Sequence, residues 1–169
     1  MYVNKRNPRN YSWNQIMSNK RIMVDMSATL FHHGHIRLLK KASEYGDVIV
    51  GLTTDNEIAT KKGYQPELSF EHRKEVLEAL DCVFEVVPTP WLIDQSVLDC
   101  FDIDLLVHGD DNSNLIRKDQ LKLSPRTAGI SSTELRNRAS KSLVQRNNQK
   151  LMLTPGPAAV LHENVLNLK

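Results

Sequence analysis

Short apolar runs alternate with helical segments along this chain of 169 residues, and this alternation limits its possible folds more than any other feature. The runs with the continuous apolar character of strands buried on both faces are 22–24, 48–52, 83–87 and 104–108. The segments with apolar residues at helical spacing are 35–45, 70–80 and 97–101. This order suits right-handed crossovers between parallel strands. We therefore expect an α/β fold with a doubly wound parallel sheet.

The ends of several predicted elements carry residues that are typical of caps and turns. Ser69 precedes the second helix as its N-cap, and Gly46 stands where the first helix would need a C-cap. Pro88 closes the third strand. A capping box at 131–134 predicts a short helix over 136–139.

The composition, 40% hydrophobic and 25% charged, is that of a folded globular chain. We expect an extension at 1–20, one domain at 21–144, and a linker or tail at 145–169. No segment reaches the roughly 20 apolar residues of a membrane span, and no apolar run follows the basic N-terminus. We therefore expect a cytoplasmic protein with no membrane partner, in which Cys82 and Cys100 are buried free thiols. The net charge of +2 argues against nucleic acid as a partner.

Polar motifs follow three of the four predicted strands. The His-rich segment 32–35 comes after the first strand, Asp55 after the second, and the Gly-Asp-Asp run 109–111 after the fourth. Ligands of doubly wound sheets bind beyond the carboxyl ends of the strands. The sequence therefore predicts a binding site at this edge of the sheet.

The segment 32–35 combines two imidazoles with a glycine at the start of a helix. Gly34 lets the backbone turn tightly toward a ligand, and the helix N-terminus attracts phosphate. His32 and His35 are three residues apart and can donate hydrogen bonds to one phosphate group. A metal site or a pair of surface histidines is the alternative, but no carboxylate or thiolate follows at a suitable spacing. We therefore expect a phosphate site and no protein-held metal.

The segment 126–133, Arg-Thr-Ala-Gly-Ile-Ser-Ser-Thr, is a second candidate anion site. It offers a guanidinium, several hydroxyl groups and a helix N-terminus within eight residues. The alternative is a plain capping box on a surface helix. The two interpretations are compatible, because the same exposed N–H groups serve both.

Together, the His-His-Gly-His run 32–35 and the segment 126–133 resemble the HxGH and RTxGISTT signatures of the cytidylyltransferases. This family includes the glycerol-3-phosphate, ethanolamine-phosphate and choline-phosphate cytidylyltransferases. The resemblance spans about 21–141, and the runs 70–74 and 109–111 support it. It implies a Rossmann-like fold of the HxGH nucleotidyltransferase type. It also implies transfer of CMP from CTP to a small phosphate- or phosphonate-bearing substrate, with release of pyrophosphate.

The resemblance also implies roles for individual residues. His32, His35, Lys62 and Arg126 would act in catalysis, the lysine from a mobile loop. Nucleotide contacts are implied for Ser27, Ala28, Gly34, Asp110, Arg126, Thr127, Ile130, Ser131 and Ser132. Contacts to the second substrate are implied for Lys61, Arg73, Trp91 and Asp55. Mg²⁺ bound with CTP and a homodimer are further expectations from the family, although loop lysines are usually only solvated and a tryptophan often serves packing.

Two residues depart from the family pattern. Thr29 replaces an aspartate before the histidines, and Asp81 replaces an arginine after the Glu-His-Arg-Lys run. These changes keep a non-catalytic nucleotide-binding module open as an alternative. An adenylyltransferase of the same superfamily is another, although the Arg-Thr-x-Gly-Ile-Ser stretch favours CTP.

The tail at 151–160 resembles the N-terminal opening of the class V pyridoxal-phosphate aminotransferases. A fused aminotransferase domain would make an amino-bearing acceptor plausible, such as 2-aminoethylphosphonate or an amino-alcohol phosphate. The alternative is a terminal loop that docks on the domain.

Overall fold

The computed structural model describes residues 20–153 of the chain. Residues 1–19 of the extension expected at 1–20 lie outside the described residues, as does the tail beyond 153 with most of the aminotransferase-like segment. The chain divides into two compact units, Met1–Ala128 and Gly129–Lys169, and each is described by itself.

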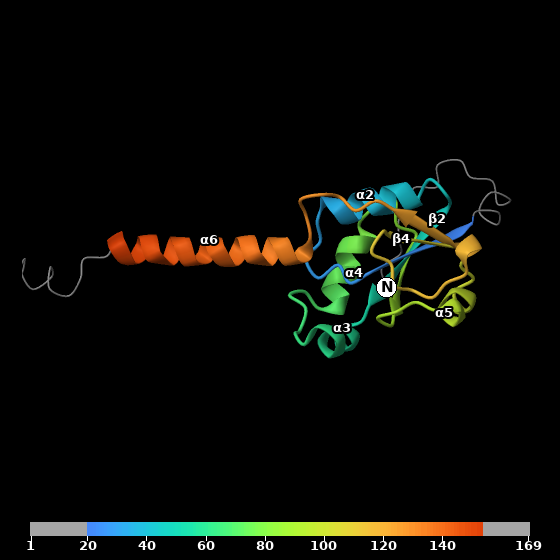
Figure 1. Cartoon of the computed structure of the whole chain (residues 1–169), viewed down its shortest axis with the longest axis horizontal. Coiled ribbons are helices and arrows are strands. Elements are labelled where there is room, and N and C mark those ends of the chain that lie inside the picture. The colour runs from blue at the N-terminus through green and yellow to red at the C-terminus, as the bar shows by residue number, and fades with distance from the viewer. Residues whose placement is uncertain (1–19, 154–169) are drawn as a thin grey trace, which may run out of the picture. The chain divides into compact units, whose positions relative to one another are not determined.

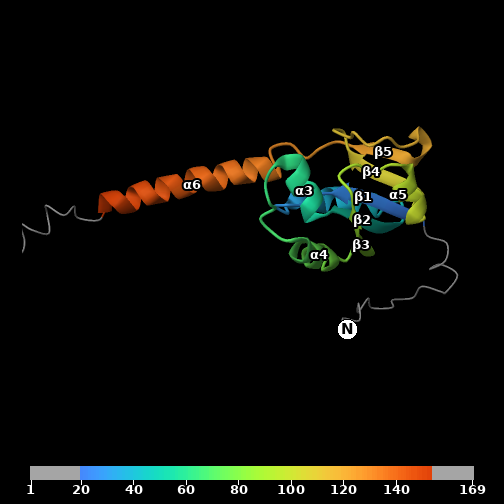
Figure 2. The same ribbon diagram turned by 90° about the horizontal axis from the view of Figure 1, so that it is seen from below.

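Five parallel strands form the sheet of the first unit, in the order β3-β2-β1-β4-β5 (Figures 1 and 2). This order confirms the doubly wound, Rossmann-like fold predicted from the alternation of strands and helices. The strands are β1 (Arg21–Met26), β2 (Asp47–Thr53), β3 (Glu85–Thr89), β4 (Leu105–Gly109) and β5 (Leu121–Ser124). The helices of this unit are α2 (His33–Ala42), α3 (Asp55–Lys62), α4 (Phe70–Glu78), α5 (Gln95–Cys100) and the 3-10 turn η1 (Lys118–Gln120).

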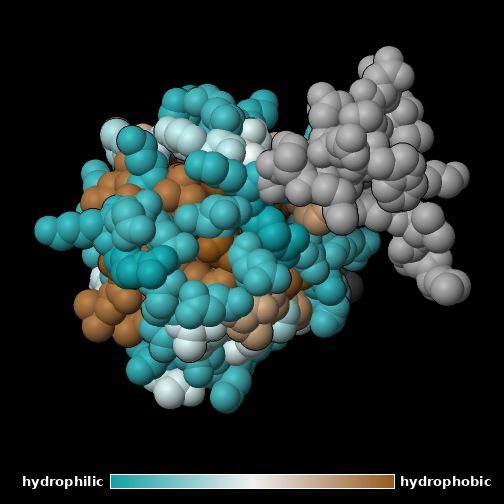
Figure 3. All heavy atoms as spheres, turned by 90° about the vertical axis from the view of Figure 1, so that its right-hand side faces the viewer, coloured by the Kyte–Doolittle hydropathy of each residue, from teal (hydrophilic) through white to brown (hydrophobic). Residues whose placement is uncertain are grey.

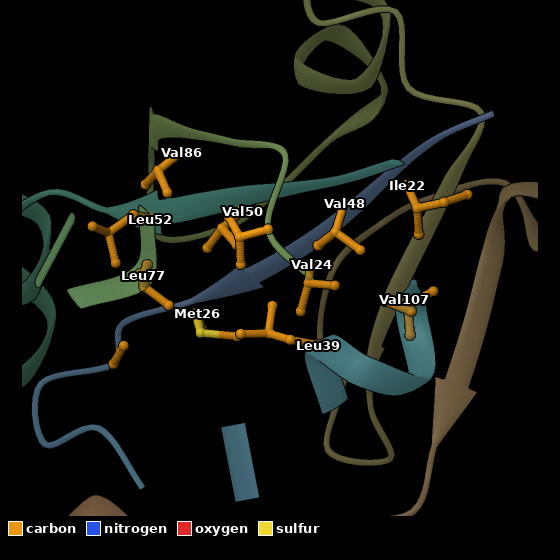
Figure 4. Close-up of a cluster of buried hydrophobic side chains, with 13 residues drawn as sticks. Ile22, Val24, Met26, Leu39, Val48, Val50, Leu52, Leu77, Val86 and Val107 are labelled. Carbon is orange, nitrogen blue, oxygen red and sulfur yellow. The ribbon is translucent and has the colours of Figure 1, made fainter. Parts of the chain in front are cut away.

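Alternate residues of β1 supply two separate cores, one on each face of the sheet. Ile22 and Val24 pack with residues of α2 and α4, as Figure 4 shows. Met23 packs on the other face with residues that include Leu98 of α5. Burial on both faces explains why these strands are apolar runs without alternation. The sheet is thereby held rigidly from both sides, which positions the loops at its edge.

Several element boundaries differ from the sequence-based predictions. Ser69 caps α4 as predicted, whereas the first helix ends at Ala42 with Ser43 as its C-cap. Gly46 serves instead at a close approach, because an added Cβ would lie 2.1 Å from the carbonyl oxygen of Lys20. Pro88 lies inside β3 rather than after it. This is possible because β3 is an edge strand, where a missing N–H need not break the ladder.

The helix α3 and the strand β5 were missed. The run Asp55–Lys62 has few apolar residues, and it buries only Ile58 among its members, so it shows no apolar stripe. Strand β5 has only four residues, two of which are exposed. Neither segment has a hydrophobic pattern that predicts its structure.

The second unit contains the helix α6, Ser132–Leu153. Ser131 accepts a hydrogen bond from the backbone N–H of Glu134 at 3.1 Å, which confirms the predicted N-cap. The helix is much longer than the predicted 136–139 and crosses the expected boundary at 144/145. Its polar sequence hid this continuation, because the side chains beyond 140 show no apolar stripe.

The surface of the described residues mixes polar and apolar side chains. Figure 3 shows one face, on which hydrophobic residues are scattered among hydrophilic ones, as is normal for folded proteins. Cys100 is exposed and Cys82 partly exposed, so the expectation of two buried thiols was wrong. No helix within residues 20–153 combines the length and the apolar character that crossing a membrane requires.

Candidate active site

The strand order reverses between the parallel neighbours β1 and β4, because the chain continues from β1 to β2 on one side of the sheet and from β4 to β5 on the other. In doubly wound sheets the crevice for a ligand lies outside the carboxyl ends of the strands at such a point. The segment 27–32 leaves β1 here and leads into α2, and the turn 110–112 leaves β4. The structure therefore brings two of the three predicted motifs to the switch point.

The two histidines of the HxGH motif cap the helix that they begin. His32 is the N-cap of α2, and its Nδ1 accepts from the backbone N–H of Gly34 at 3.1 Å. His35 reaches back, so that its Nδ1 accepts from the backbone N–H of His32 at 3.2 Å. This is a capping box in which imidazoles take the places of the usual Ser and Glu. The motif thus stabilises the helix as well as supplying functional groups.

The capping bonds also determine where each imidazole carries its proton. A ring nitrogen that accepts a hydrogen bond from a backbone N–H has its lone pair there. In the neutral ring the proton of His32 and of His35 therefore lies on Nε2. Both residues consequently carry an Nε2–H, which is the donor that a phosphoryl oxygen requires.

His35 is held in the neutral form. Burial lowers the pKa of His35, and the nearby His32 and Arg126 act in the same direction, so that together they bring it to about 3. Its ring stacks on Phe31 at 5.3 Å between centroids and lies 3.9 Å from the ring of His32. A hydrogen-bond donor without a net charge is therefore present over the whole physiological pH range.

Arg126 lies near His35, as its effect on the pKa of His35 shows. Its Nη1 donates to Oδ2 of Asp111 at 2.8 Å, and both side chains are about half exposed. The side chain of Asp111 lies close over Gly109, where an added Cβ would be 2.6 Å from its Oδ1. Asp110 is the exposed residue between them. The structure thus places Arg126 and the Gly-Asp-Asp turn together.

Arg73 was predicted to contact substrate, but it is buried at 1% exposure. Its guanidinium donates to the carbonyl oxygens of Ser27, Thr53 and Leu68, at 2.6, 3.0 and 3.1 Å. It also pairs with Oδ1 of Asp55 at 2.6 Å. A guanidinium with these partners joins the ends of β1 and β2 to α4. The structure therefore places Arg73 in a supporting clamp, and its contact with substrate stays a prediction.

Asp55 is occupied in the same clamp. Its other oxygen, Oδ2, accepts from the backbone N–H of Phe70 at 2.9 Å. Both oxygens of Asp55 have internal partners, so the structure shows this carboxylate in a supporting role, and its substrate contact stays a prediction. Its position after β2 suggested that Asp55 binds a ligand, but the same position allows it to join α3 to α4.

The tight turn after β1 lies at Ala28 and not at Gly34. Ala28 has a positive φ of 45°, which is uncommon for a residue with a Cβ. Gly34 lies in the first turn of α2, where its N–H caps against His32. Ser27, whose carbonyl oxygen Arg73 holds, precedes the strained residue. The clamp therefore supports the segment that leads to the histidines.

The two predicted lysines lie in the last turn of α3 and not in a loop. The ammonium group of Lys62 lies over the ring of Trp91, 5.2 Å from the centroid, which is within the range of a cation–π interaction. The backbone N–H of Trp91 donates to Glu57 of the same helix at 2.9 Å. The structure thus brings Lys62 and Trp91 together, while Lys61 is exposed beside them.

The segment 126–133 crosses the division between the two units. Arg126 and Thr127 belong to the first unit, whereas Ile130, Ser131 and Ser132 belong to the second. Contacts of these last three residues with nucleotide stay a prediction.

The side chains of Asp25, His108 and Asn114 form a polar cluster at the switch point, and the sequence did not reveal it. Nδ2 of Asn114 donates to Oδ2 of Asp25 at 3.2 Å, and Nε2 of His108 lies 3.5 Å from Oδ1. Asp25 and His108 stand at the carboxyl ends of β1 and β4. Their positions could have indicated the cluster from the sequence, because each of the two residues follows an apolar run at the end of a strand.

A doubly wound sheet with anion-binding elements at its switch point defines a nucleotide-binding enzyme of the α/β class. The model of the cytidylyltransferase-like family matches residues 27–119. The chain is 40% identical over 125 residues to the glycerol-3-phosphate cytidylyltransferase of Bacillus spizizenii, covering 69% of this chain and 95% of that protein. The chain therefore belongs to the cytidylyltransferase-like family.

One further relative agrees with this assignment, and one solved structure shares the fold. The ethanolamine-phosphate cytidylyltransferase of Dictyostelium discoideum is 33% identical over 127 residues, covering 68% of this chain and 35% of that protein. A lipopolysaccharide core biosynthesis protein from Thermoplasma volcanium has a similar fold, with a TM-score of 0.50 at 18% identity. That match covers 73% of this chain and 88% of the other. It bears on the fold alone.

Proposed function

We propose that this protein transfers CMP from CTP to a small phosphorylated alcohol, releasing pyrophosphate. The observation that carries the proposal is the capped pair His32 and His35, whose capping bonds put a proton on Nε2 of each ring. The similarity to enzymes named as glycerol-3-phosphate and ethanolamine-phosphate cytidylyltransferases supports the identity of the nucleotide and the class of acceptor.

In the proposed reaction, an oxygen of the acceptor phosphate attacks the α-phosphorus of CTP. A new P–O bond forms as the bond from the α-phosphorus to the bridging oxygen breaks, and pyrophosphate leaves with that electron pair. The nucleophile is already an anion, so positioning and charge stabilisation account for the catalysis. The Nε2–H groups of His32 and His35 donate to the phosphoryl oxygens, where negative charge increases in the transition state.

Two positive groups, Arg126 near His35 and Lys62 at the end of α3, complete the proposed phosphate site. Arg126 binds the triphosphate after exchanging Asp111 for phosphate oxygens, and Lys62 moves from the face of Trp91 to the same group. The ring of Trp91 then faces the acceptor, with Lys61 nearby. The remaining proposed nucleotide contacts come from Ser27, Ala28, Gly34, Asp110, Thr127, Ile130, Ser131 and Ser132.

Mg²⁺ enters this proposal with the nucleotide. Within the described residues, no group of three or more His, Cys, Asp or Glu side chains could hold a metal ion. Mg²⁺ keeps several waters and commonly binds through substrate phosphates. Bound to the triphosphate oxygens, it would neutralise part of their charge, and the chain's own cations would neutralise the rest.

An amino-bearing acceptor, such as 2-aminoethylphosphonate, is the finer part of the proposal. It rests on the aminotransferase-like sequence at 151–160 and on the ring of Trp91, which already accommodates one ammonium group. An acceptor with an amine could occupy that face when Lys62 leaves it. A homodimer is proposed from the resemblance alone, and sedimentation of the purified chain measures it.

A pyrophosphate-release assay tests the proposal. CTP or ATP is combined with Mg²⁺ and with glycerol 3-phosphate, ethanolamine phosphate or 2-aminoethylphosphonate in turn. We expect turnover with CTP and at least one acceptor, and its loss in His35→Ala but not in His72→Ala, a matched change of an exposed histidine. Turnover with ATP alone would instead favour an adenylyltransferase, and CTP binding without turnover on any acceptor would favour a non-catalytic module.

A further inference from the structure

Asp25 and His108 form a second pair of titratable side chains at the carboxyl ends of β1 and β4. Their side chains are 11% and 20% exposed, and Oδ1 of Asp25 lies 3.5 Å from Nε2 of His108. The reaction proposed above uses neither residue. Two titratable groups this close together in a largely buried site need a stabilising interaction between them.

The hydrogen bonds of Asn114 orient the carboxylate of Asp25. Oδ1 of Asn114 accepts from the backbone N–H of Ile93 at 2.8 Å, so its amide nitrogen must face Asp25, where it donates to Oδ2 at 3.2 Å. The other oxygen of Asp25, Oδ1, is buried and makes no hydrogen bond within the described part of the chain. That oxygen is the one that faces His108.

The backbone determines the proton on the other side of the imidazole. Nδ1 of His108 lies 3.0 Å from the carbonyl oxygen of Gly109. A carbonyl oxygen only accepts, so Nδ1 must carry a proton. If Asp25 were ionised and His108 neutral, two lone pairs would therefore face each other across 3.5 Å in a buried site. A second proton between Nε2 and Oδ1 removes this conflict.

We propose that Asp25 and His108 share one proton, and that the pair is a positioning unit for the turn that holds Arg126. With the proton the pair carries no net charge, whether the proton is drawn on the imidazole or on the carboxyl group. Without it, the pair carries a buried negative charge. The protonation state therefore belongs to the coupled pair and cannot be assigned to one of the two residues.

The charged groups that face the pair explain how it acts on Arg126. Asp111, in the turn after β4, has Oδ1 4.0 Å from Nδ1 of His108, and its Oδ2 holds Arg126 at 2.8 Å. Loss of the shared proton puts a negative charge beside the carboxylate of Asp111. Repulsion then moves Asp111, and Arg126 with it, away from His35.

The environment of Asp25 favours keeping the proton. Burial raises the pKa of Asp25, the field of Asp111 raises it as well, and the imidazole of His108 and the amide of Asn114 oppose this. As the pH rises and the pair loses its proton, we expect the KM for CTP to increase while kcat changes less. This kinetic consequence rests on the proposed function, whereas the shared proton does not.

Nuclear magnetic resonance of the full chain with isotopically labelled histidine and aspartate tests the shared proton directly. We expect Nδ1 of His108 to be protonated throughout, and the titration midpoint of the Asp25 carboxyl to rise by about one pH unit in His108→Gln, which lacks the imidazole. His72→Gln, an exposed change, leaves that midpoint in place. A bare Nδ1 in the wild-type protein, or an unchanged midpoint of Asp25 in His108→Gln, overturns the proposal. The wild-type measurement decides the point even where His108→Gln does not fold.

The positioning role is tested by KM for CTP and kcat as functions of pH. In Asp25→Asn the amide can donate to Nε2 without a shared proton, so we expect the alkaline rise in KM to disappear. Asp119→Asn, an exposed carboxylate, is the control that keeps it. An identical alkaline rise in Asp25→Asn overturns the positioning role. Absence of turnover in the wild type at every pH contradicts the proposed function and leaves the resonance result to decide the shared proton.

Discussion

Two pairs of side chains that contain imidazoles lie at the switch point, and they differ in whether the main chain donates a hydrogen bond to Nδ1 or accepts one from it. In the pair His32 and His35, each Nδ1 accepts from a backbone N–H, so the rings are neutral with the proton on Nε2. In the pair Asp25 and His108, Nδ1 of the imidazole faces a carbonyl oxygen and must donate. The partner on the main chain, more than the ring itself, therefore decides what each histidine can do.

The largest expected effect distinguishes the donor role of the first pair from its capping role. We expect His35→Ala to lose about 10²- to 10³-fold in turnover, because a donor to the transition state is removed. His35→Gln keeps an acceptor for the backbone N–H of His32 and so preserves the cap. Measured kcat of the two variants, with Tm as a check of folding, makes the comparison. Equal, near-normal turnover in both would remove the assigned role.

Arg126 lowers the pKa of His35 and is held by Asp111, which lies beside the second pair, and its removal is expected to have the next largest effect. In Arg126→Gln we expect kcat/KM for CTP to fall by about 10- to 100-fold, since a charged hydrogen bond to phosphate is lost. The pKa of His35 should rise at the same time, because Arg126 lowers it in the wild type. A titration of His35 by resonance methods checks this second part. A pKa of His35 that stays where it was would mean that Arg126 is not held near it.

The two pairs should respond to acid with opposite signs. The pKa of His35 is about 3 in the folded chain against its ordinary 6.5, so the unfolded chain binds more protons between these values. Its contribution to stability is therefore lost as the pH falls through this window. The pKa of Asp25 is raised above 3.8, so its contribution favours the fold at low pH and is lost as the pH rises.

Urea unfolding at neutral pH and at about pH 4.5 measures this difference. We expect acidification to destabilise the wild type more than His35→Gln, and to stabilise it relative to Asp25→Asn. Equal responses of the wild type and His35→Gln would show that the imidazole is not held neutral.

The smallest expected effect concerns the turn between the pairs. In Gly109→Ala, the added Cβ would lie 2.6 Å from Oδ1 of Asp111, which is the end of a half-exposed side chain and can move away. We expect a loss of less than about 1 kcal/mol in unfolding free energy, as for other exposed ion pairs. A small increase in KM for CTP should accompany it. A large loss of stability would show that the turn is rigid.

Sequence reasoning predicted the fold well, because burial on both faces leaves a strong apolar signal in β1, β2 and β4. It did not reveal the buried clamp around Arg73, since a guanidinium with carbonyl partners looks in sequence like a phosphate ligand. It also failed at the Asp25–His108 pair, which depends on two strands that are distant in the chain. Local pattern finds groups that share a segment, and it misses those that only the sheet brings together.

Both edges of the sheet are poor templates for another chain. On the β3 side, Pro88 lacks the N–H that an added strand would need, and on the other side β5 has only four residues and carries the charged Lys122. Strand-to-strand association, and the cross-β aggregation that follows from it, are thereby disfavoured. These edges therefore favour docking of a second copy through helices or loops over pairing of strands.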